Sequence, residues 1–236
     1  MKICKLVLPH KKSQLLIIIA ILWLISVYMY VTKFHENTNL YIIQEMSFNI
    51  FCYSAAIVPI YLCILTTIYY YYSNSSVILN FKTRKSFLNK VYLAFFKVAI
   101  IYMLFYMIIT IIISNLLAGE VREFDSFVMI NFLKIYSIHV LFLFFLGCIY
   151  LLLIDLIHSI SISFVITLSF PFISQIFNFY FGVRALINQL IMLSTYQSID
   201  VIELFLFLSK LVGFTCIVIY LSFSILEKKD FVTIKD

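Results

Sequence analysis

"FVMINFLKIYSIHVLFLFFLGCIYLLL", from Phe127 to Leu153, is a run of 27 residues in which Lys134 is the single acidic or basic side chain apart from His139. A helix needs about 20 apolar residues to cross the roughly 30 Å hydrocarbon core of a bilayer. Backbone groups in lipid must be hydrogen-bonded within the protein, and a continuous apolar run lacks the alternation of a membrane β-strand. This stretch therefore predicts a membrane-spanning α-helix.

The same pattern extends outward from this helix in both directions. Five further apolar runs are separated by short segments that carry most of the charge: 15–31, 46–72, 91–117, 160–181 and 201–226. The 236 residues are 64% hydrophobic and 12% charged, which is far too apolar for a soluble domain. The sequence predicts an all-α polytopic membrane protein in which residues 1–236 form one domain with six transmembrane helices.

The basic residues predict how these helices are oriented. Eleven lysines and arginines fall in the two terminal segments and the segment between spans two and three, whereas Lys33, Arg122 and Arg184 fall on the other side. Cytoplasmic loops are enriched in Lys and Arg, so we expect both termini in the cytoplasm. The net charge of +6 then serves orientation and contact with anionic lipids, and predicts no nucleic-acid partner.

The fifth span has an irregular pattern. Pro171, in "LSFPFISQIFNFYFG", removes a helix hydrogen bond and is expected to kink or split the span. Residues 182–200 then place apolar side chains at helical spacing between polar ones. We expect a broken fifth helix followed by an amphipathic or re-entrant helix at the outer membrane interface.

Residues 68–90, "IYYYYSNSSVILNFKTRKSFLNK", interrupt the apolar pattern. Four tyrosines suit the membrane interface, where aromatic rings with a polar tip accumulate. An apolar patch and basic residues follow: Val77, Ile78, Leu79, Phe81, Lys82, Arg84 and Lys85. Two interpretations stay open, a solvated loop with orienting charges, or a short helix that inserts its apolar face into a groove on a cytoplasmic partner.

These residues resemble the permease subunits of ABC-2-type transporters. The resemblance lies in six spans with both ends inside, a basic loop before the third span, and Thr83, Arg84, Lys85 and Lys90 in "TRKSFLNKVYL". A very short fourth-to-fifth loop, "IDLIHSIS", and the charged "EKKDF" near the end are also similar. Asn89 stands where the family often has glycine, and 73–90 has no acidic residue.

The resemblance implies that 73–90 is a coupling helix that docks on a separate P-loop ATPase, with a second contact at the Asp155–Ser159 turn through Asp155 and His158. ATP and magnesium would bind that ATPase, and this chain contains no G-x-x-x-x-G-K-[ST] motif and is expected to bind no cofactor itself. It also implies a dimer with a second copy or a paralogous permease in a bacterial cell membrane. Small permeases of this kind serve bacteriocin or lantibiotic immunity, or export amphipathic peptides such as phenol-soluble modulins.

Four polar residues inside the spans are candidates for a substrate pathway: His139, Ser174, Gln175 and Asn178. Ionisable groups at the bilayer midplane often mark pathways, but a neutral histidine bonded to a neighbouring helix is commoner. Ser174, Gln175 and Asn178 are equally consistent with hydrogen bonds that tie helices together. Both interpretations stay open.

Other function classes find little support. No H-E-x-x-H, paired Asp or Ser/His arrangement indicates an intramembrane enzyme, and the five cysteines form no C-x-x-C motif, so neither zinc nor disulfides are expected. A channel would need an acidic ring or a glycine-rich filter. A drug or lipid exporter of the same architecture and a non-transporting membrane scaffold remain as alternatives.

Overall fold

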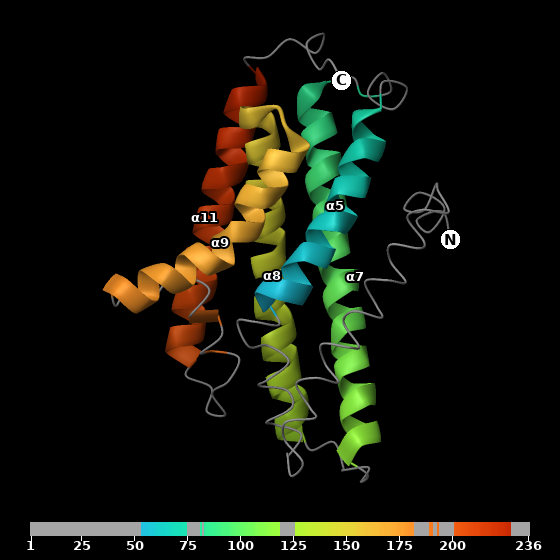
Figure 1. Ribbon diagram of the computed structural model, residues 1–236, viewed down its shortest axis with the longest axis vertical. Coiled ribbons are helices and arrows are strands. Elements are labelled where there is room, and N and C mark those ends of the chain that lie inside the picture. Colours follow the sequence, from blue (N-terminus) through green and yellow to red (C-terminus); the bar gives the residue numbers. More distant parts are fainter. Residues whose placement is uncertain are drawn as a thin grey trace.

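The computed structural model describes residues 53–74, 81, 83–118, 126–181, 189–190, 193 and 201–227, most of which are helical. The π-helix η1 (Tyr53–Ile57) leads into α5 (Val58–Ser73). Four longer helices follow: α7 (Arg84–Ala118), α8 (Ser126–Ile157), α9 (Ile160–Phe181) and α11 (Val201–Glu227). Figure 1 shows that α7, α8 and α11 run side by side along the long axis of the bundle.

Three of the described helices are long and apolar enough to cross a membrane. The qualifying stretches are Arg84–Thr110, Phe132–Ile157 and Ile202–Ile225, and Ile160–Ile173 is a shorter apolar helix. Large apolar side chains such as Phe105, Ile166 and Phe205 are exposed on the outside of the bundle. Soluble monomers rarely expose so much apolar surface, whereas a bilayer covers it.

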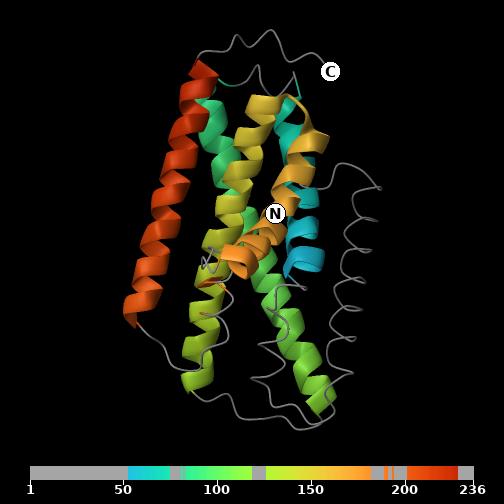
Figure 2. The ribbon, with the colours of Figure 1, turned by 60° about the vertical axis from the view of Figure 1, so that its left-hand side comes forward.

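The helix α8 occupies the centre of the bundle. It contacts α5, α7, α9 and α11, and Figure 2 shows it with α11 on one side, α5 and α9 on the other, and α7 crossing behind it. The exposed fraction of its side chains is correspondingly low, and Phe142, Leu143, Leu146 and Tyr150 are fully buried. The stretch of sequence that most strongly predicts a span is thus also the one that the other helices cover.

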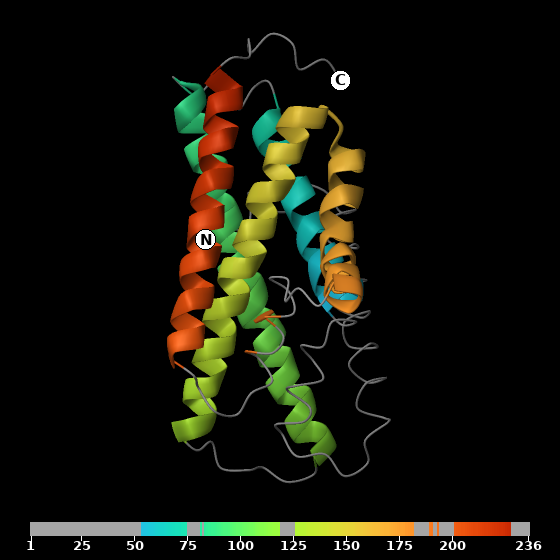
Figure 3. The same cartoon turned by 90° about the vertical axis from the view of Figure 1, so that its left-hand side faces the viewer.

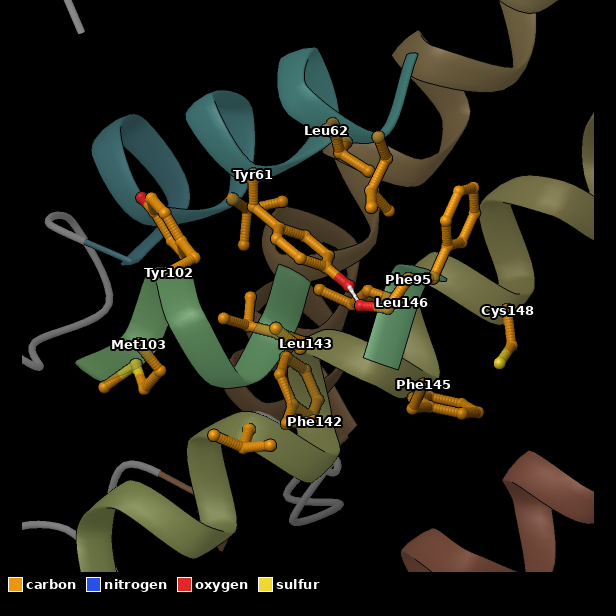
Figure 4. Packing of buried hydrophobic residues seen from close by; sticks show 14 of the residues in the cluster. Tyr61, Leu62, Phe95, Tyr102, Met103, Phe142, Leu143, Phe145, Leu146 and Cys148 are labelled. Carbon is orange, nitrogen blue, oxygen red and sulfur yellow. Dashed lines mark hydrogen bonds between the residues drawn. The ribbon is translucent and has the colours of Figure 1, made fainter. Parts of the chain in front are cut away.

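Gly147 lets α5 and α7 approach α8 closely. A Cβ added there would lie 3.0 Å from Leu65 Cδ1, 3.0 Å from Tyr61 Oη and 3.3 Å from Phe95 Cδ2. Figure 4 shows this packing, with the Tyr61 ring lying between α5 and α7. No side chain larger than hydrogen fits at position 147 unless these neighbours move.

Tyrosine hydroxyls hold neighbouring helices together. Tyr102 Oη on α7 donates a hydrogen bond to the Ile57 carbonyl at 3.0 Å, and Tyr136 Oη on α8 donates to the Ile100 carbonyl at 3.2 Å. Thr66 Oγ1 and Tyr150 Oη share a 2.7 Å bond between α5 and α8. In an apolar medium such bonds satisfy groups that water cannot reach. These hydrogen bonds therefore link α7 with η1, α8 with α7, and α5 with α8.

The helix α9 is continuous through Pro171 in the described backbone. Figure 1 shows its C-terminal half running sideways out of the bundle, and Figure 3, turned by 90°, shows that half nearly end-on. Phe172, Ile176 and Tyr180 are exposed on it, whereas Pro171 is buried. The expected kink is therefore a bend within one helix, and the helix is not split.

The helices α7, α8, α9 and α11 match the predicted spans or are longer than them. The bounds of α9 equal the predicted 160–181, while α7 begins seven residues before the predicted 91 and α8 ends four residues after the predicted 153. The predicted first span, 15–31, and most of the 182–200 segment lie outside the described residues. Six spans and cytoplasmic termini therefore stay predictions.

Candidate functional site

Five helix ends meet at one end of the bundle, which we call the loop end. Here α5 ends at Ser73, α7 begins at Arg84, α8 ends at Ile157, α9 begins at Ile160 and α11 ends at Glu227. All five lie at the top of the view in Figure 1. The loop end therefore brings together the ends of the two observed connections, 74–83 and 158–159, which lie within the predicted coupling segment 73–90 and the predicted Asp155–Ser159 turn.

Phe81, near the end of the α5–α7 connection, packs against both helices. Its ring lies 6.4 Å from the ring of Tyr72 on α5 and 5.6 Å, edge to face, from the ring of Phe87 on α7, measured between centroids. Such aromatic pairs stabilise beyond the apolar area that they bury. Phe81 is half-buried, so part of its ring is available to a partner while the rest spans α5 and α7.

The other docking candidates divide into described and undescribed residues. Val77, Ile78, Leu79 and Lys82 lie outside the described residues, so the predicted coupling helix stays a prediction. Arg84 and Lys85 lie in the first turn of α7, which means that the basic stretch is the start of the helix and not a loop before it. Phe87 was not named in the sequence analysis. Its aromatic side chain lies six positions after Phe81, and the structure brings the two rings into contact.

Thr83 caps the helix that carries these bases. Its Oγ1 accepts a hydrogen bond from the Ser86 backbone N–H at 3.2 Å, and its carbonyl accepts one from the Phe87 N–H at 3.2 Å. The first turn of α7 has no acidic residue. Cations at a helix N-terminus oppose the helix dipole, at a cost of about 0.3–1 kcal/mol each. The positive charges of Arg84 and Lys85 therefore lower the stability of the first turn of α7.

The connection between α8 and α9 is only two residues long. His158 adopts a left-handed φ of 59°, and its N–H donates to the Ile154 carbonyl at 2.9 Å, which closes α8. Ser159 Oγ then accepts a 3.4 Å bond from the Ile162 N–H and begins α9. Glycine is the usual residue in this backbone conformation, so an exposed histidine here is a local strain of the kind that clusters at functional sites.

Asp155 lies inside α8 and not in the turn where the sequence placed it. Its side chain is 8% exposed, and its carboxylate is close enough to act electrostatically on the hydroxyls of Tyr69 and Tyr92. His158 is therefore the member of the predicted pair that reaches the surface. The reason is that α8 continues four residues beyond the apolar run, carrying Asp155 into the interior.

Of the four pathway candidates, the structure describes the side chain of His139 alone. His139 is fully buried near the middle of α8, which is the environment of a packing histidine rather than of a group lining a wet pathway. Ser174, Gln175 and Asn178 lie on the half of α9 that leaves the bundle, but their side chains are outside the described part. Their role stays open.

No group of three or more His, Cys, Asp or Glu residues that could hold a metal ion occurs within the described ranges. Comparisons with known proteins add no identification, because no family model, no curated protein and no solved structure matches the chain. The functional argument therefore rests on the residues of the loop end.

Proposed function

We propose that this protein is the membrane-spanning permease subunit of a bacterial ABC exporter. It forms the translocation pathway with a second permease, which is another copy or a paralogue, and the loop end faces the cytoplasm. Two separate P-loop ATPase subunits bind ATP and magnesium and supply the energy. The cargo class is amphipathic or antimicrobial peptides, either exported or removed as self-immunity.

The observation that carries this proposal is the arrangement of bases at the start of α7. Arg84 and Lys85 lie in the first turn of a helix whose dipole disfavours them. Orientation in the membrane accounts for positive charge near this end, but not for its location within the first helical turn. A partner with acidic groups that binds these bases, and also the apolar residues Val77–Leu79 that precede them in the sequence, would offset this cost.

A second contact follows from the α8–α9 turn. His158 is exposed, and the hydrogen bond from its backbone N–H to the Ile154 carbonyl accompanies its left-handed backbone conformation. Asp155 lies about one turn earlier in α8 and is buried within the bundle. A docked ATPase would then touch the start of α7 and the start of α9 together, so that its movement reaches both helices.

The test is co-purification of the full chain with a P-loop ATPase from the cells that express it. Val77→Asp and Ile78→Asp place a charge in the apolar patch and are expected to lower ATPase recovery at least tenfold, with unchanged amounts of the chain in the membrane. Asn74→Asp adds the same charge at an exposed position of the loop end and serves as the matched control. Phe81→Asp is less informative, because Phe81 also joins Tyr72 to Phe87.

Equal ATPase recovery with Val77→Asp, Ile78→Asp and Asn74→Asp contradicts the docking surface. Absence of any ATPase from the wild-type preparation favours the membrane scaffold instead. If the ATPase binds but peptide export and resistance are unchanged when the chain is deleted, the cargo is of another class, such as a drug or a lipid. His139→Ala with normal export assigns that histidine to packing.

A further inference from the structure

One face of α7 is exposed and carries two lysines in the half nearer the loop end. Lys90 and Lys97 are seven residues apart, which is about two helical turns and about 10.5 Å along the axis, so both lie on the same face. Both side chains are exposed. We call this exposed face the lysine face; in order from the loop end its residues are Lys90, Leu93, Lys97, Ile101, Leu104 and Ile108.

The lysine face turns away from α11, the helix that α7 meets at the loop end. The Tyr92 ring of α7 lies 6.3 Å from the Phe223 ring of α11, between centroids. Residues two apart on a helix point in nearly opposite directions, about 200° from each other, so Lys90 faces away from this contact. Lys85 Nζ lies 6.0 Å from the centre of the same Phe223 ring and is therefore on the α11 side as well.

The three carboxylates of the described helices all lie off the lysine face. The helices α5, α7 and α9 contain no Asp or Glu. Asp155 of α8 is buried within the bundle, and Glu203 begins α11 at the end remote from the loop end. Glu227 ends α11, from which the lysine face turns away. The charges of Lys90 and Lys97 are thus available to a ligand from outside these helices.

The depth of Lys97 gives a reason for such a ligand. Lys97 lies within the stretch of α7 that is apolar enough to cross a membrane, and the ring of the preceding Phe96 meets that of Phe144, near the middle of α8, at 5.1 Å between centroids. A charge exposed to lipid at this depth is costly unless it reaches the membrane surface. Side chains lean toward the N-terminus of their helix, which for α7 is the loop end, so Lys97 extends toward Lys90.

Beyond Lys97 the lysine face is apolar. The side chains of Ile101, Leu104 and Ile108 are 58%, 51% and 45% exposed. Lys97 and Ile108 are eleven residues apart, or about 16.5 Å along the helix, close to the roughly 15 Å of hydrocarbon in one leaflet of a bilayer. The face therefore has the order of a phospholipid, with the charges at the loop end and one leaflet's length of apolar surface beneath them.

We propose that the lysine face of α7 binds an anionic phospholipid from the leaflet that borders the loop end. The lipid phosphate lies between the ammonium groups of Lys90 and Lys97, and an acyl chain covers Ile101, Leu104 and Ile108. Charge complementarity selects an anionic headgroup over a zwitterionic one, whose own cationic group would meet the lysines. The inference needs no ATPase and stands independently of the proposed function.

The helix α11 provides a matched control. Glu203 and Lys210 are also exposed and seven residues apart on one face, but their charges are opposite and give no net preference for an anion. Lys210→Gln removes an exposed lysine from a span, as Lys97→Gln does. A general attraction between the basic chain and anionic lipid would be reduced equally by both variants.

The experiment is native mass spectrometry of the full chain with phosphatidylglycerol and phosphatidylcholine that carry the same acyl chains. The wild type should retain phosphatidylglycerol at least about tenfold better. Lys90→Gln and Lys97→Gln should each lower this ratio about fivefold, the contribution expected of one lysine at the membrane surface. Lys97→Arg should keep the ratio, and Lys210→Gln should change it by less than about twofold.

Lys97→Leu separates binding from folding. Leucine suits a lipid-exposed position, so the variant should unfold in phosphatidylcholine at or above the midpoint of the wild type and still lose the preference for phosphatidylglycerol. An equal fall of the ratio in Lys210→Gln, or no fall in Lys90→Gln and Lys97→Gln, overturns the site. Displacement of phosphatidylglycerol by inorganic phosphate at equal concentration contradicts the acyl contact. Loss of a second copy of the chain in Lys97→Gln, at an unchanged lipid ratio, would assign the face to a protein contact instead.

Discussion

The middle of α8 and the loop end are held in shape by different means. Around Gly147 the shape is set by side chains from three helices that leave no free space. At the loop end it is set by local hydrogen bonds at Thr83, His158 and Ser159 and by the aromatic contacts of Phe81, which leave Lys85 and His158 exposed. The difference indicates that a partner can engage the loop end without disturbing the packing around Gly147.

The largest effect is expected from a substitution in the middle of α8. Gly147→Ala puts a methyl group 3.0 Å from Leu65 Cδ1 and Tyr61 Oη, both of which are fully buried and have little space to move. Overpacking of this kind costs about 1–3 kcal/mol. Thermal unfolding in detergent should show the midpoint falling by several degrees.

Gly213→Ala is the matched control on α11, because nothing lies within 4 Å of a Cβ added there. Alanine favours a helix over glycine by up to about 1 kcal/mol, so this variant should equal or exceed the wild type in stability. Equal midpoints for the two variants would contradict the view that α8 is the fixed centre of the bundle.

A smaller effect is expected at the first turn of α7. Thr83→Ala removes the acceptor of the Ser86 N–H and should cost about 1 kcal/mol, as the loss of an N-cap does. The midpoint should fall by about 2–4 °C, and ATPase recovery should fall as well because Arg84 and Lys85 lose their fixed position. Thr83→Ser keeps the capping hydroxyl and should behave as the wild type; if it behaves as Thr83→Ala, the cap is not the cause.

Hydropathy identified the helices well and their ends less well. The bounds of α9 were predicted because its apolar run and its helix coincide. The predicted start of α7 was late because hydropathy marks the bilayer edge, while the helix continues through Arg84, Lys85 and Lys90 to the Thr83 cap. Asp155 was assigned to a turn for the same reason.

The contacts between helices could not be predicted from the sequence. The close packing at Gly147 could not be predicted, because its neighbours Tyr61, Leu65 and Phe95 lie more than 50 residues away in the chain. The ring contact of Tyr92 with Phe223 spans an even greater separation. Such facts depend on how helices cross, which hydropathy does not encode.

The smallest effect, and the sharpest test of the loop end, is expected at His158. A residue with a Cβ pays about 1 kcal/mol for a left-handed backbone, whereas glycine adopts it freely but loses more entropy on folding. His158→Gly should therefore raise the free energy of unfolding by about 0.5 kcal/mol, and His158→Ala, which keeps the strained backbone without the imidazole, should not. If the histidine is retained for docking, His158→Gly will be the more stable protein and recover less ATPase, and a variant that is both more stable and fully competent would mean that the strain at this turn serves no contact.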